Sequence, residues 1–145
     1  MVTVPEDVAV VKEYLTQLGS ELQMSSLPKL GAMIETPAAA LSARGIAKHV
    51  DFLSFGTNDL TQYAFAADRE NVAVEQYYND DAEVIFRLLQ ITHDDVPDMP
   101  LSVCGELAGR AEHIHRLLQC GIRTLSVASS LIPIIKETIR NSMCI

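Results

Sequence analysis

Hydrophobic positions near the start of the chain recur at the spacing of an amphipathic helix. Five apolar residues within the segment 3–22 follow one another at three- or four-residue intervals: Val8, Val11, Leu15, Leu18 and Leu22. This period predicts a helix with one apolar face. Thr3 and Glu6 stand at the spacing of a capping box, which predicts the start of that helix.

After this helix, short continuous apolar runs alternate with helical patterns. The runs predict strands at residues 30–35, 51–56, 101–105 and 124–130. Each run precedes a predicted helix, and these helices comprise residues 37–50, a segment carrying residues 84–89, residues 111–120, and a last helix with Pro133 in its first turn. A helix followed by four strand–helix units predicts an α/β protein with a parallel sheet.

Particular residues mark the expected helix ends. Thr36 and Pro37 are suited to cap and start the helix at 37–50. Asp80 or Asp81 could cap the helix that follows them. Gly121 can end the helix at 111–120, because glycine accepts the left-handed backbone common at that position.

Polar residues stand where three of the predicted strands end. The first strand ends in Glu35, the second in Gly56-Thr57-Asn58-Asp59, which opens a longer polar segment (57–79), and the third in Cys104-Gly105-Glu106. The carboxyl ends of parallel strands meet at one edge of a sheet, where ligands bind in such folds. We therefore expect these side chains to share one edge.

Size and charge narrow the classes of protein. The 145 residues, 48% apolar and 21% charged, suit one ordinary soluble domain (1–145). There is no uncharged apolar run of about 18 residues for a membrane span, and the start lacks the basic-then-apolar order of a signal peptide. The net charge of −8 argues against a general nucleic-acid binder, which needs a basic surface.

The cysteines indicate the redox compartment. Cys104, Cys120 and Cys144 are an odd number without CxxC spacing. This argues against a disulfide framework and against a thiolate zinc site, and it favours a reducing cytoplasm.

Glu35 and Asp59 are the candidate metal ligands. Neighbouring carboxylates repel one another unless a cation lies between them, and one or two carboxylates together with substrate oxygens suit Mg²⁺. Each residue also has a structural interpretation. Asp59 could cap the turn that follows it, and Glu35 could pair with a nearby Lys or Arg.

Asn58 and Arg69 are the candidate anion-binding residues. The Asn58 amide can donate to an anionic oxygen, although asparagine is also a common turn residue. The Arg69 guanidinium is a planar fork suited to phosphate or carboxylate. Its alternative role is a surface ion pair with Asp68 or Glu70.

Cys104 is a candidate general acid. An ordinary thiol has a pKa of about 8.5 and is mostly protonated at neutral pH, so it could donate a proton. A cysteine in an apolar strand can also be core filler. His113 and His115 flank Ile114 on a predicted helix, lack the spacing of a helical zinc pair, and are expected to be solvated.

Three of these motifs together resemble a known family. "GAMIETPAAAL" (31–41), "GTNDLTQYAFAADREN" (56–71) and "SVCGELAG" (102–109) closely resemble the C-terminal domain of enzyme I, the phosphoenolpyruvate–protein phosphotransferase of the bacterial sugar phosphotransferase system. The resemblance runs through essentially the whole chain. Pyruvate phosphate dikinase and phosphoenolpyruvate synthase look related around residues 56–59, although the other motifs are more similar to enzyme I.

The resemblance implies a (β/α)8 barrel that binds phosphoenolpyruvate and Mg²⁺. By motif position, Glu35 and Asp59 correspond to the metal ligands, Asn58 and Arg69 to residues that contact the phosphoryl group, and Cys104 to the acid that protonates the enolpyruvate carbon. It implies transfer of the phosphoryl group to a protein histidine with release of pyruvate. It also implies a phosphocarrier partner reached through a separate N-terminal domain, and a cytoplasmic homodimer.

Four strand–helix units make only the C-terminal half of such a barrel. Residues 1–3 resemble the end of the family's fourth strand, so we expect a fragment, a truncated relative, or a half-barrel that pairs with another copy. A non-catalytic role in dimerisation or docking, a fragment of a dikinase or synthase, and a related barrel lyase are the alternative functions. The chain departs from enzyme I at Arg110, where an acidic residue is usual.

Overall fold

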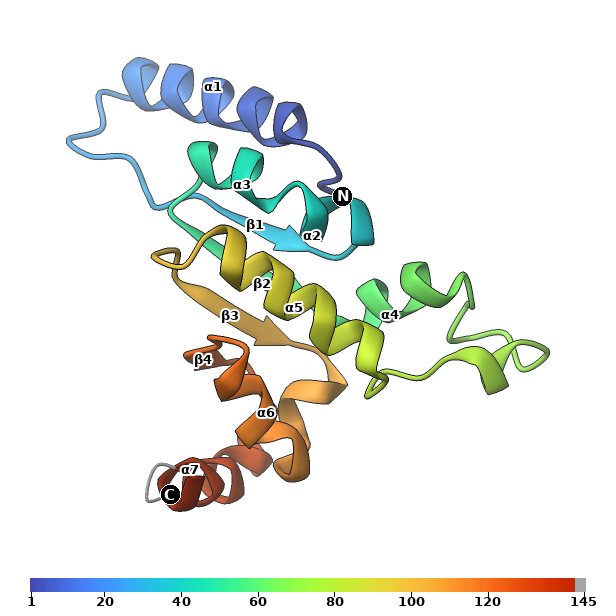
Figure 1. Cartoon of the computed structure of the whole chain (residues 1–145). Coiled ribbons are helices and arrows are strands. Elements are labelled where there is room, and N and C mark those ends of the chain that lie inside the picture. Colours follow the sequence, from blue (N-terminus) through green and yellow to red (C-terminus); the bar gives the residue numbers. More distant parts are fainter. Residues whose placement is uncertain (143–145) are drawn as a thin grey trace.

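The strands of the sheet run in one direction and follow one another in chain order. The computed structural model describes residues 1–142, in which β1 (Gly31–Ile34), β2 (Phe52–Gly56), β3 (Leu101–Cys104) and β4 (Thr124–Leu125) form one sheet in the order β1-β2-β3-β4 (Figure 1). All three strand pairs are parallel. The predicted α/β class with a parallel sheet is therefore confirmed.

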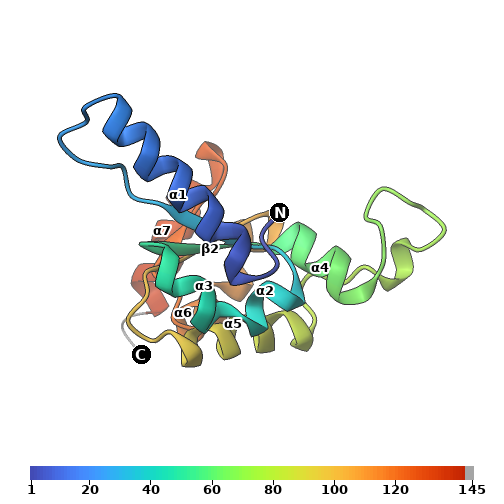
Figure 2. The same ribbon diagram turned by 90° about the horizontal axis from the view of Figure 1, so that it is seen from above.

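Helices connect the strands, and several of them lie against one face of the sheet. Their bounds are α1 Pro5–Glu21, α2 Pro37–Leu41, α3 Ala43–Ile46, α4 Thr57–Phe65, α5 Glu83–Asp95, α6 Ile114–Gln119 and α7 Ile132–Ser142. Figure 2 shows α2, α3, α5 and α6 on the same side of β2. In the described part of the chain, none of the helices has both the length and the apolar content needed to cross a membrane.

Burial alternates along the strands, as expected when a sheet buries one face. The face that meets the helices carries buried apolar residues: Ala32, Ile34, Leu53, Phe55, Leu101 and Val103. Met33 and Phe52 lie on the opposite face and remain 38% and 37% exposed. The helices thus form one layer, and the second face of the sheet is left partly open.

The start of α1 differs from the prediction. The helix begins at Pro5 and not at a Thr3–Glu6 capping box. The Asp7 carboxylate accepts hydrogen bonds from the backbone N–H groups of Thr3 (2.8 Å) and Val4 (3.1 Å). These bonds to the ionised form lower the pKa of Asp7. Pro5 occupies the first helical position, so the carboxylate that accepts from the start of the helix is that of Asp7 and not that of Glu6.

The predicted apolar face of α1 is largely uncovered. Val8 is buried, but Val11, Leu18 and Leu22 are 51%, 52% and 71% exposed. The helix packs against α3 and the 3-10 turn after it, along a narrow strip. The helical period is therefore correct, although several of its apolar residues remain more than half exposed.

Several predicted boundaries hold, and others change. Thr36 caps α2 by accepting a hydrogen bond from the Ala39 N–H (3.1 Å), and Gly121 follows α6 with φ 79°. The predicted helix at 37–50 is interrupted at Ser42, whose backbone leaves helical geometry. The polar segment at 57–79, for which no helix was predicted, begins with α4.

The cap of α5 and the length of β4 were predicted incorrectly. The N-cap of α5 is Ala82, and neither Asp80 nor Asp81 caps it, because both carboxylates face Arg110. The fourth strand was expected at 124–130 but comprises Thr124–Leu125. The Ser126 N–H, just beyond the strand, still donates to the Val103 carbonyl.

Candidate functional site

Glu35 lies directly after β1 and packs over the end of β2. A Cβ atom placed on Gly56 would lie 2.9 Å from Cγ and 3.2 Å from Oε1 of Glu35. The missing side chain at Gly56 therefore makes room for this carboxylate. Within residues 1–142, Glu35 forms no ion pair with a Lys, Arg or His. The alternative pairing is thus not observed there.

Asn58 and Asp59 lie in the first turn of α4. The backbone N–H of Glu106 donates to Oδ1 of Asn58 (3.0 Å), and an N–H group requires an oxygen as its acceptor. This bond fixes the amide orientation and leaves the Asn58 NH₂ as a donor. The carboxylate of Asp59 lies near the positive end of α4. The N-cap position of α4 is occupied by Gly56 and not by Asp59.

Arg69 approaches Asp59 from the segment after α4. Its Nη1 lies 3.9 Å from Oδ1 of Asp59, and both side chains are more than a third exposed. No ion pair with Asp68 or Glu70, the alternative partners, occurs in the described residues. An exposed pair at this distance contributes little to stability. The pair does bring the guanidinium to the edge of the sheet.

Cys104 ends β3, in register with Gly56. Its thiol donates a hydrogen bond to the Phe55 carbonyl (3.4 Å). Burial raises the pKa of the thiol, and the carboxylates of Glu35 and Asp59 raise it further, while a hydrogen bond with Ser54 acts in the opposite direction. The thiol is therefore protonated at neutral pH.

Close packing joins the ends of β2 and β3. Gly105 has φ 93°, a conformation that favours glycine. A Cβ at this position would lie 2.5 Å from Oγ1 of Thr57 and 2.8 Å from Oδ1 of Asn58. The Thr57 hydroxyl in turn donates to the Cys104 carbonyl (2.9 Å). Glycine at 105 therefore allows the first turn of α4 to meet the tip of β3.

Two clefts lie beside these residues. The larger, of about 720 Å³, is lined by Asn58, Arg69, Glu70, Glu75, Tyr78, Asp80, Glu106 and Arg110. The smaller, of about 460 Å³, includes Cys104, Gly105, Glu106, Arg110 and Ser126 in its lining. Asn58 and Arg69 thus share one cleft, and Cys104 lies in the next. Glu35 and Asp59 line neither cleft.

The two carboxylates suit one kind of metal site. In residues 1–142, no three His, Cys, Asp or Glu side chains are grouped so that they could hold a metal ion among themselves. Glu35 and Asp59 are a pair of hard oxygen ligands near one thiol. Such a pair fits Mg²⁺ completed by substrate oxygens and waters, and does not fit an ion held by protein ligands alone.

Two residues of the larger cleft were not predicted to have a role there. The Tyr78 hydroxyl donates to the Asn58 carbonyl (3.1 Å), and burial raises the pKa of this hydroxyl, which therefore remains a donor. Arg110 donates to Asp80 (2.8 Å). Both interactions join residues at least twenty positions apart. Local sequence patterns carry no signal for such pairs.

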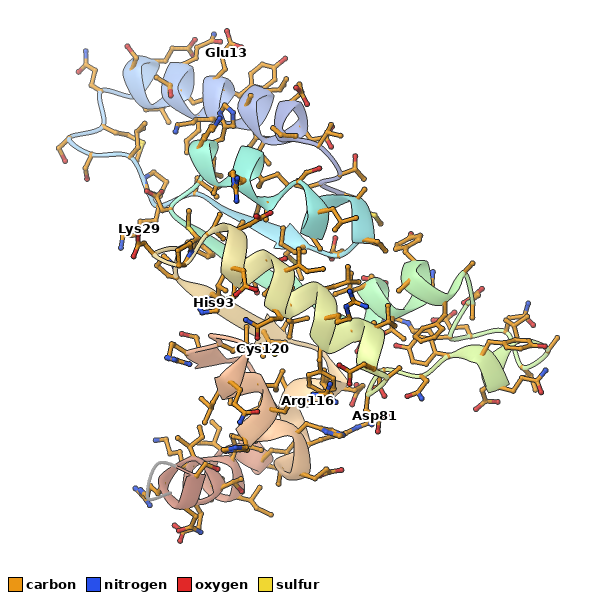
Figure 3. The ribbon with its side chains drawn as sticks, in the orientation of Figure 1. Glu13, Lys29, Asp81, His93, Arg116 and Cys120 are labelled. Carbon is orange, nitrogen blue, oxygen red and sulfur yellow. The ribbon has the colours of Figure 1, made fainter. Side chains whose placement is uncertain are left out.

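His113 was predicted to be solvated, but most of its side chain is shielded from solvent. Its side chain is 20% exposed, its ring packs against Phe86 with 5.7 Å between the centroids, and Nε2 lies 3.4 Å from Oδ2 of Asp81. Figure 3 labels Asp81 just before α5, together with Arg116, which stacks on the same Phe86 ring. The side chains of His113 and Arg116, which both follow β3, thus cover the Phe86 ring. This packing shields part of the His113 imidazole from solvent.

The family described as "PEP-utilising enzyme, PEP-binding domain" matches residues 1–144. The chain belongs to this family. Phosphoenolpyruvate-protein phosphotransferase of Mycoplasma pneumoniae is 40% identical over 132 residues, which cover 90% of this chain and 23% of that protein. The protein of the same name from Buchnera aphidicola is 38% identical over 149 residues, covering 98% of this chain and 26% of the relative. The resemblance to enzyme I is thus confirmed.

Membership extends to a second group of PEP-utilising enzymes. A probable phosphoenolpyruvate synthase of Methanocaldococcus jannaschii is 34% identical over 142 residues, covering 96% of this chain and 12% of that protein. The chain spans about a quarter of the length of the phosphotransferases that it matches. As a PEP-binding domain of this family, it carries both the Gly-Thr-Asn-Asp and the Cys-Gly-Glu segments at one edge of its sheet.

Proposed function

We propose that this chain binds phosphoenolpyruvate and Mg²⁺ at the carboxyl edge of its sheet, as part of a phosphoenolpyruvate–protein phosphotransferase. The main support is the convergence of three separate segments: Glu35 packs over Gly56, Gly56 is in register with Cys104, and Asp59 lies in the turn that follows Gly56. Asn58 and Arg69 adjoin them in one cleft. Membership of the PEP-utilising family supplies the substrate class.

Each side chain has a chemical role in this proposal. Glu35 and Asp59 would hold Mg²⁺, which when bound would neutralise charge on the phosphoryl group. The Asn58 NH₂ and the Arg69 guanidinium donate to the phosphoryl oxygens and orient the group. The phosphoryl group then leaves the enol oxygen for a histidine nitrogen of a separate domain, from which a phosphocarrier protein receives it.

Cys104 completes the reaction on the remaining enolate. Its thiol gives a proton to the methylene carbon, so that the enolate becomes pyruvate and the sulfur is left as thiolate. The raised pKa keeps the proton on the sulfur at neutral pH until a strongly basic carbon is formed. Reprotonation from solvent restores the thiol.

For the fold, we propose the C-terminal half of a (β/α)8 barrel. Consecutive parallel strands with helices on one face form the wall of such a barrel, and its other face points inward. Met33 and Phe52 are partly exposed on that second face, and β1 and β4 are the edges of the sheet. The other half of the barrel would cover both features.

Isothermal calorimetry tests the metal and substrate assignment. The chain is expected to bind Mg²⁺ weakly and to bind phosphoenolpyruvate only in its presence, without turnover. The double variant Glu35→Gln/Asp59→Asn should lose both, because it removes both metal ligands and keeps the side-chain shapes. A matched control, Glu13→Gln/Glu137→Gln, removes two exposed helical charges. Equal binding in the double variant and the control would contradict the assignment.

The open face supports a second candidate function, a non-catalytic half-barrel that pairs with another copy. Exposed Met33 and Phe52 and two free strand edges are hazards that association would remove. Sedimentation velocity with and without phosphoenolpyruvate and Mg²⁺ separates the two functions. A pure dimerisation module should assemble to the same extent with or without ligand, and in the Cys104→Ser variant. Calorimetric binding that requires Glu35 and Asp59 would favour the first function.

A further inference from the structure

We propose that Arg110 is a further substrate-binding residue, which binds the carboxylate of the enolpyruvate portion where the two clefts meet. The inference rests on the proposed function and specifies which residue binds the carboxylate, the second anionic group of the substrate. Arg110 and Glu106 line both the larger cleft of about 720 Å³ and the smaller one of about 460 Å³.

The position of Arg110 follows from the two ends of the substrate. Arg69 and Asn58 line the larger cleft alone, whereas Cys104 lines the smaller one. A molecule whose phosphoryl group meets Arg69 and whose methylene carbon meets the Cys104 thiol must cross the junction between the clefts. The carboxylate is bonded to the central carbon of the enolpyruvate portion, which also carries the enol oxygen and is bonded to the methylene carbon that Cys104 protonates. Arg110 is therefore the cation that this group meets.

The negative charge of the larger cleft makes Arg110 important for binding an anion. The lining contains two arginines, Arg69 and Arg110, against four carboxylates, from Glu70, Glu75, Asp80 and Glu106. An anionic ligand is repelled by this balance unless cations compensate. Arg110 carries half of the positive charge, so that its loss would leave one arginine against four acids. Nearby Mg²⁺ would compensate at the metal ligands, which lie outside this lining.

Two aspartates fix the guanidinium without using all its donors. Nη2 lies 2.8 Å from Oδ2 of Asp80, whose side chain is 9% exposed, and Nη1 lies 3.7 Å from Oδ2 of Asp81. A guanidinium has five N–H donors in a planar fork. The side chain of Arg110 is 38% exposed, which leaves part of that fork open to the cleft. A held and partly open fork is suited to a carboxylate.

The alternative is a structural role, in which Arg110 only neutralises buried Asp80. The two roles give different expectations for Asp80→Asn. In either role this variant removes one negative charge from the cleft and should favour any anion. If Arg110 binds the substrate carboxylate, the freed guanidinium should raise the affinity for phosphoenolpyruvate more than the affinity for phosphate, and if Arg110 only neutralises Asp80, the two affinities should rise alike.

The experiment measures affinities of the whole chain by calorimetry, with Mg²⁺, for phosphoenolpyruvate and for inorganic phosphate. Arg110→Gln should weaken phosphoenolpyruvate binding by about tenfold and weaken phosphate binding clearly less, because phosphate experiences the lost charge but lacks the carboxylate. Arg69→Gln should weaken both. Arg140→Gln removes the same charge from a residue that is 74% exposed on α7, and should weaken neither. Arg110→Lys keeps the charge and is the variant to use if Arg110→Gln fails to fold.

The outcomes separate the two proposals. Unchanged phosphoenolpyruvate affinity in Arg110→Gln, with binding that still requires Glu35 and Asp59, overturns the role of Arg110 alone. Equal weakening for phosphoenolpyruvate and phosphate overturns it too, since the effect would then not depend on the carboxylate. If the unaltered chain binds neither probe, both the proposed function and the role of Arg110 fail. Selective loss in Arg110→Gln, together with a gain in Asp80→Asn that is larger for phosphoenolpyruvate than for phosphate, supports the inference.

Discussion

The hydroxyl of Thr57 donates a hydrogen bond of 2.9 Å to the carbonyl oxygen of Cys104. Thr57 is fully buried and is the first residue of α4, so this bond ties the turn after β2 to the last residue of β3. Asn58 and Asp59 follow Thr57 in the same turn. The proposed acid and two of its proposed partners are therefore linked by one partly buried hydrogen bond.

Thr57→Val should destabilise the fold and weaken the site. Valine keeps the shape of threonine but leaves the partly buried Cys104 carbonyl without this donor, which costs about 1 kcal/mol in the free energy of unfolding. Urea denaturation measures that loss. Calorimetry should show weaker Mg²⁺ and phosphoenolpyruvate binding. Thr57→Ser keeps the hydroxyl and should retain most of the binding.

Thr138→Val is the matched control for Thr57→Val. The Thr138 hydroxyl also donates to a backbone carbonyl, that of Ile134 (2.9 Å), but on the exposed side of α7. Its loss should change the free energy of unfolding by less than about 0.5 kcal/mol and leave ligand binding unaltered. If Thr57→Val matched this control in both measurements, the tie between the two strand ends would have no energetic importance.

Gly105→Ala should affect both stability and binding. Its positive φ disfavours alanine, and the new Cβ would lie 2.5 Å from Oγ1 of Thr57, so that the start of α4 must move. Backbone strain of this kind costs about 1–3 kcal/mol. Gly121→Ala introduces a comparable strain at φ 79°, beside His93 and away from the site. Both variants should unfold at lower urea concentration, while only Gly105→Ala should weaken Mg²⁺ binding at equal folded fraction. Unaltered binding in Gly105→Ala would contradict the proposed site.

Much of the fold could be predicted because its signals are local. Thr36 next to Pro37 marks the start of α2, and the apolar runs mark strands, since the period of side-chain burial follows directly from backbone geometry. The helix α4 was missed because it begins after glycine and mixes Thr61, Gln62 and Tyr63 with few apolar residues. The short β4 was overestimated because its length depends on pairing with β3, which involves only Ser102 and Val103.

The candidate site could be predicted in outline and not in its contacts. Glu35, Asp59 and Cys104 stand at the ends of predicted strands, and parallel order brings such ends to one edge. Pairs between distant segments left no local signal. Arg110 reaches Asp80, thirty positions earlier, and the Glu106 N–H orients Asn58. These interactions depend on how loops pack after the sheet has formed.

The pH dependence of Cys104 alkylation should respond to the charges of Glu35 and Asp59 and to bound Mg²⁺. Burial and the charges of Glu35 and Asp59 raise the pKa of the thiol, so the iodoacetamide reaction rate should rise with pH at a midpoint above the ordinary value of about 8.5. Glu35→Gln removes one negative charge and should lower the midpoint. Mg²⁺ should lower it as well, since a cation favours the thiolate.

The alkylation measurement needs a background without the other thiols. Cys120→Ser removes the buried cysteine on the other side of the sheet, and Cys144→Ser removes a residue that lies outside the described part of the chain. Glu13→Gln serves as the control for charge and should leave the midpoint unaltered. A midpoint that does not respond to Glu35→Gln or to Mg²⁺ would place the thiol too far from the carboxylates for the proposed chemistry.

Arg69→Gln should weaken phosphoryl binding and leave the free energy of unfolding almost unchanged. The pair that Arg69 forms with Asp59 is 3.9 Å long and exposed, so its loss should change the free energy of unfolding by less than about 0.5 kcal/mol. Phosphoryl binding uses the same guanidinium at full charge and should weaken by about tenfold. Phosphate titrations followed by calorimetry measure this loss, and Arg69→Lys should restore part of it because a point charge replaces the fork. A large loss of stability with unaltered phosphate affinity would instead assign Arg69 to the structure of the loop. The site would then retain Asn58 as its proposed phosphoryl contact, and Arg110 would be the arginine left in the larger cleft to attract an anion.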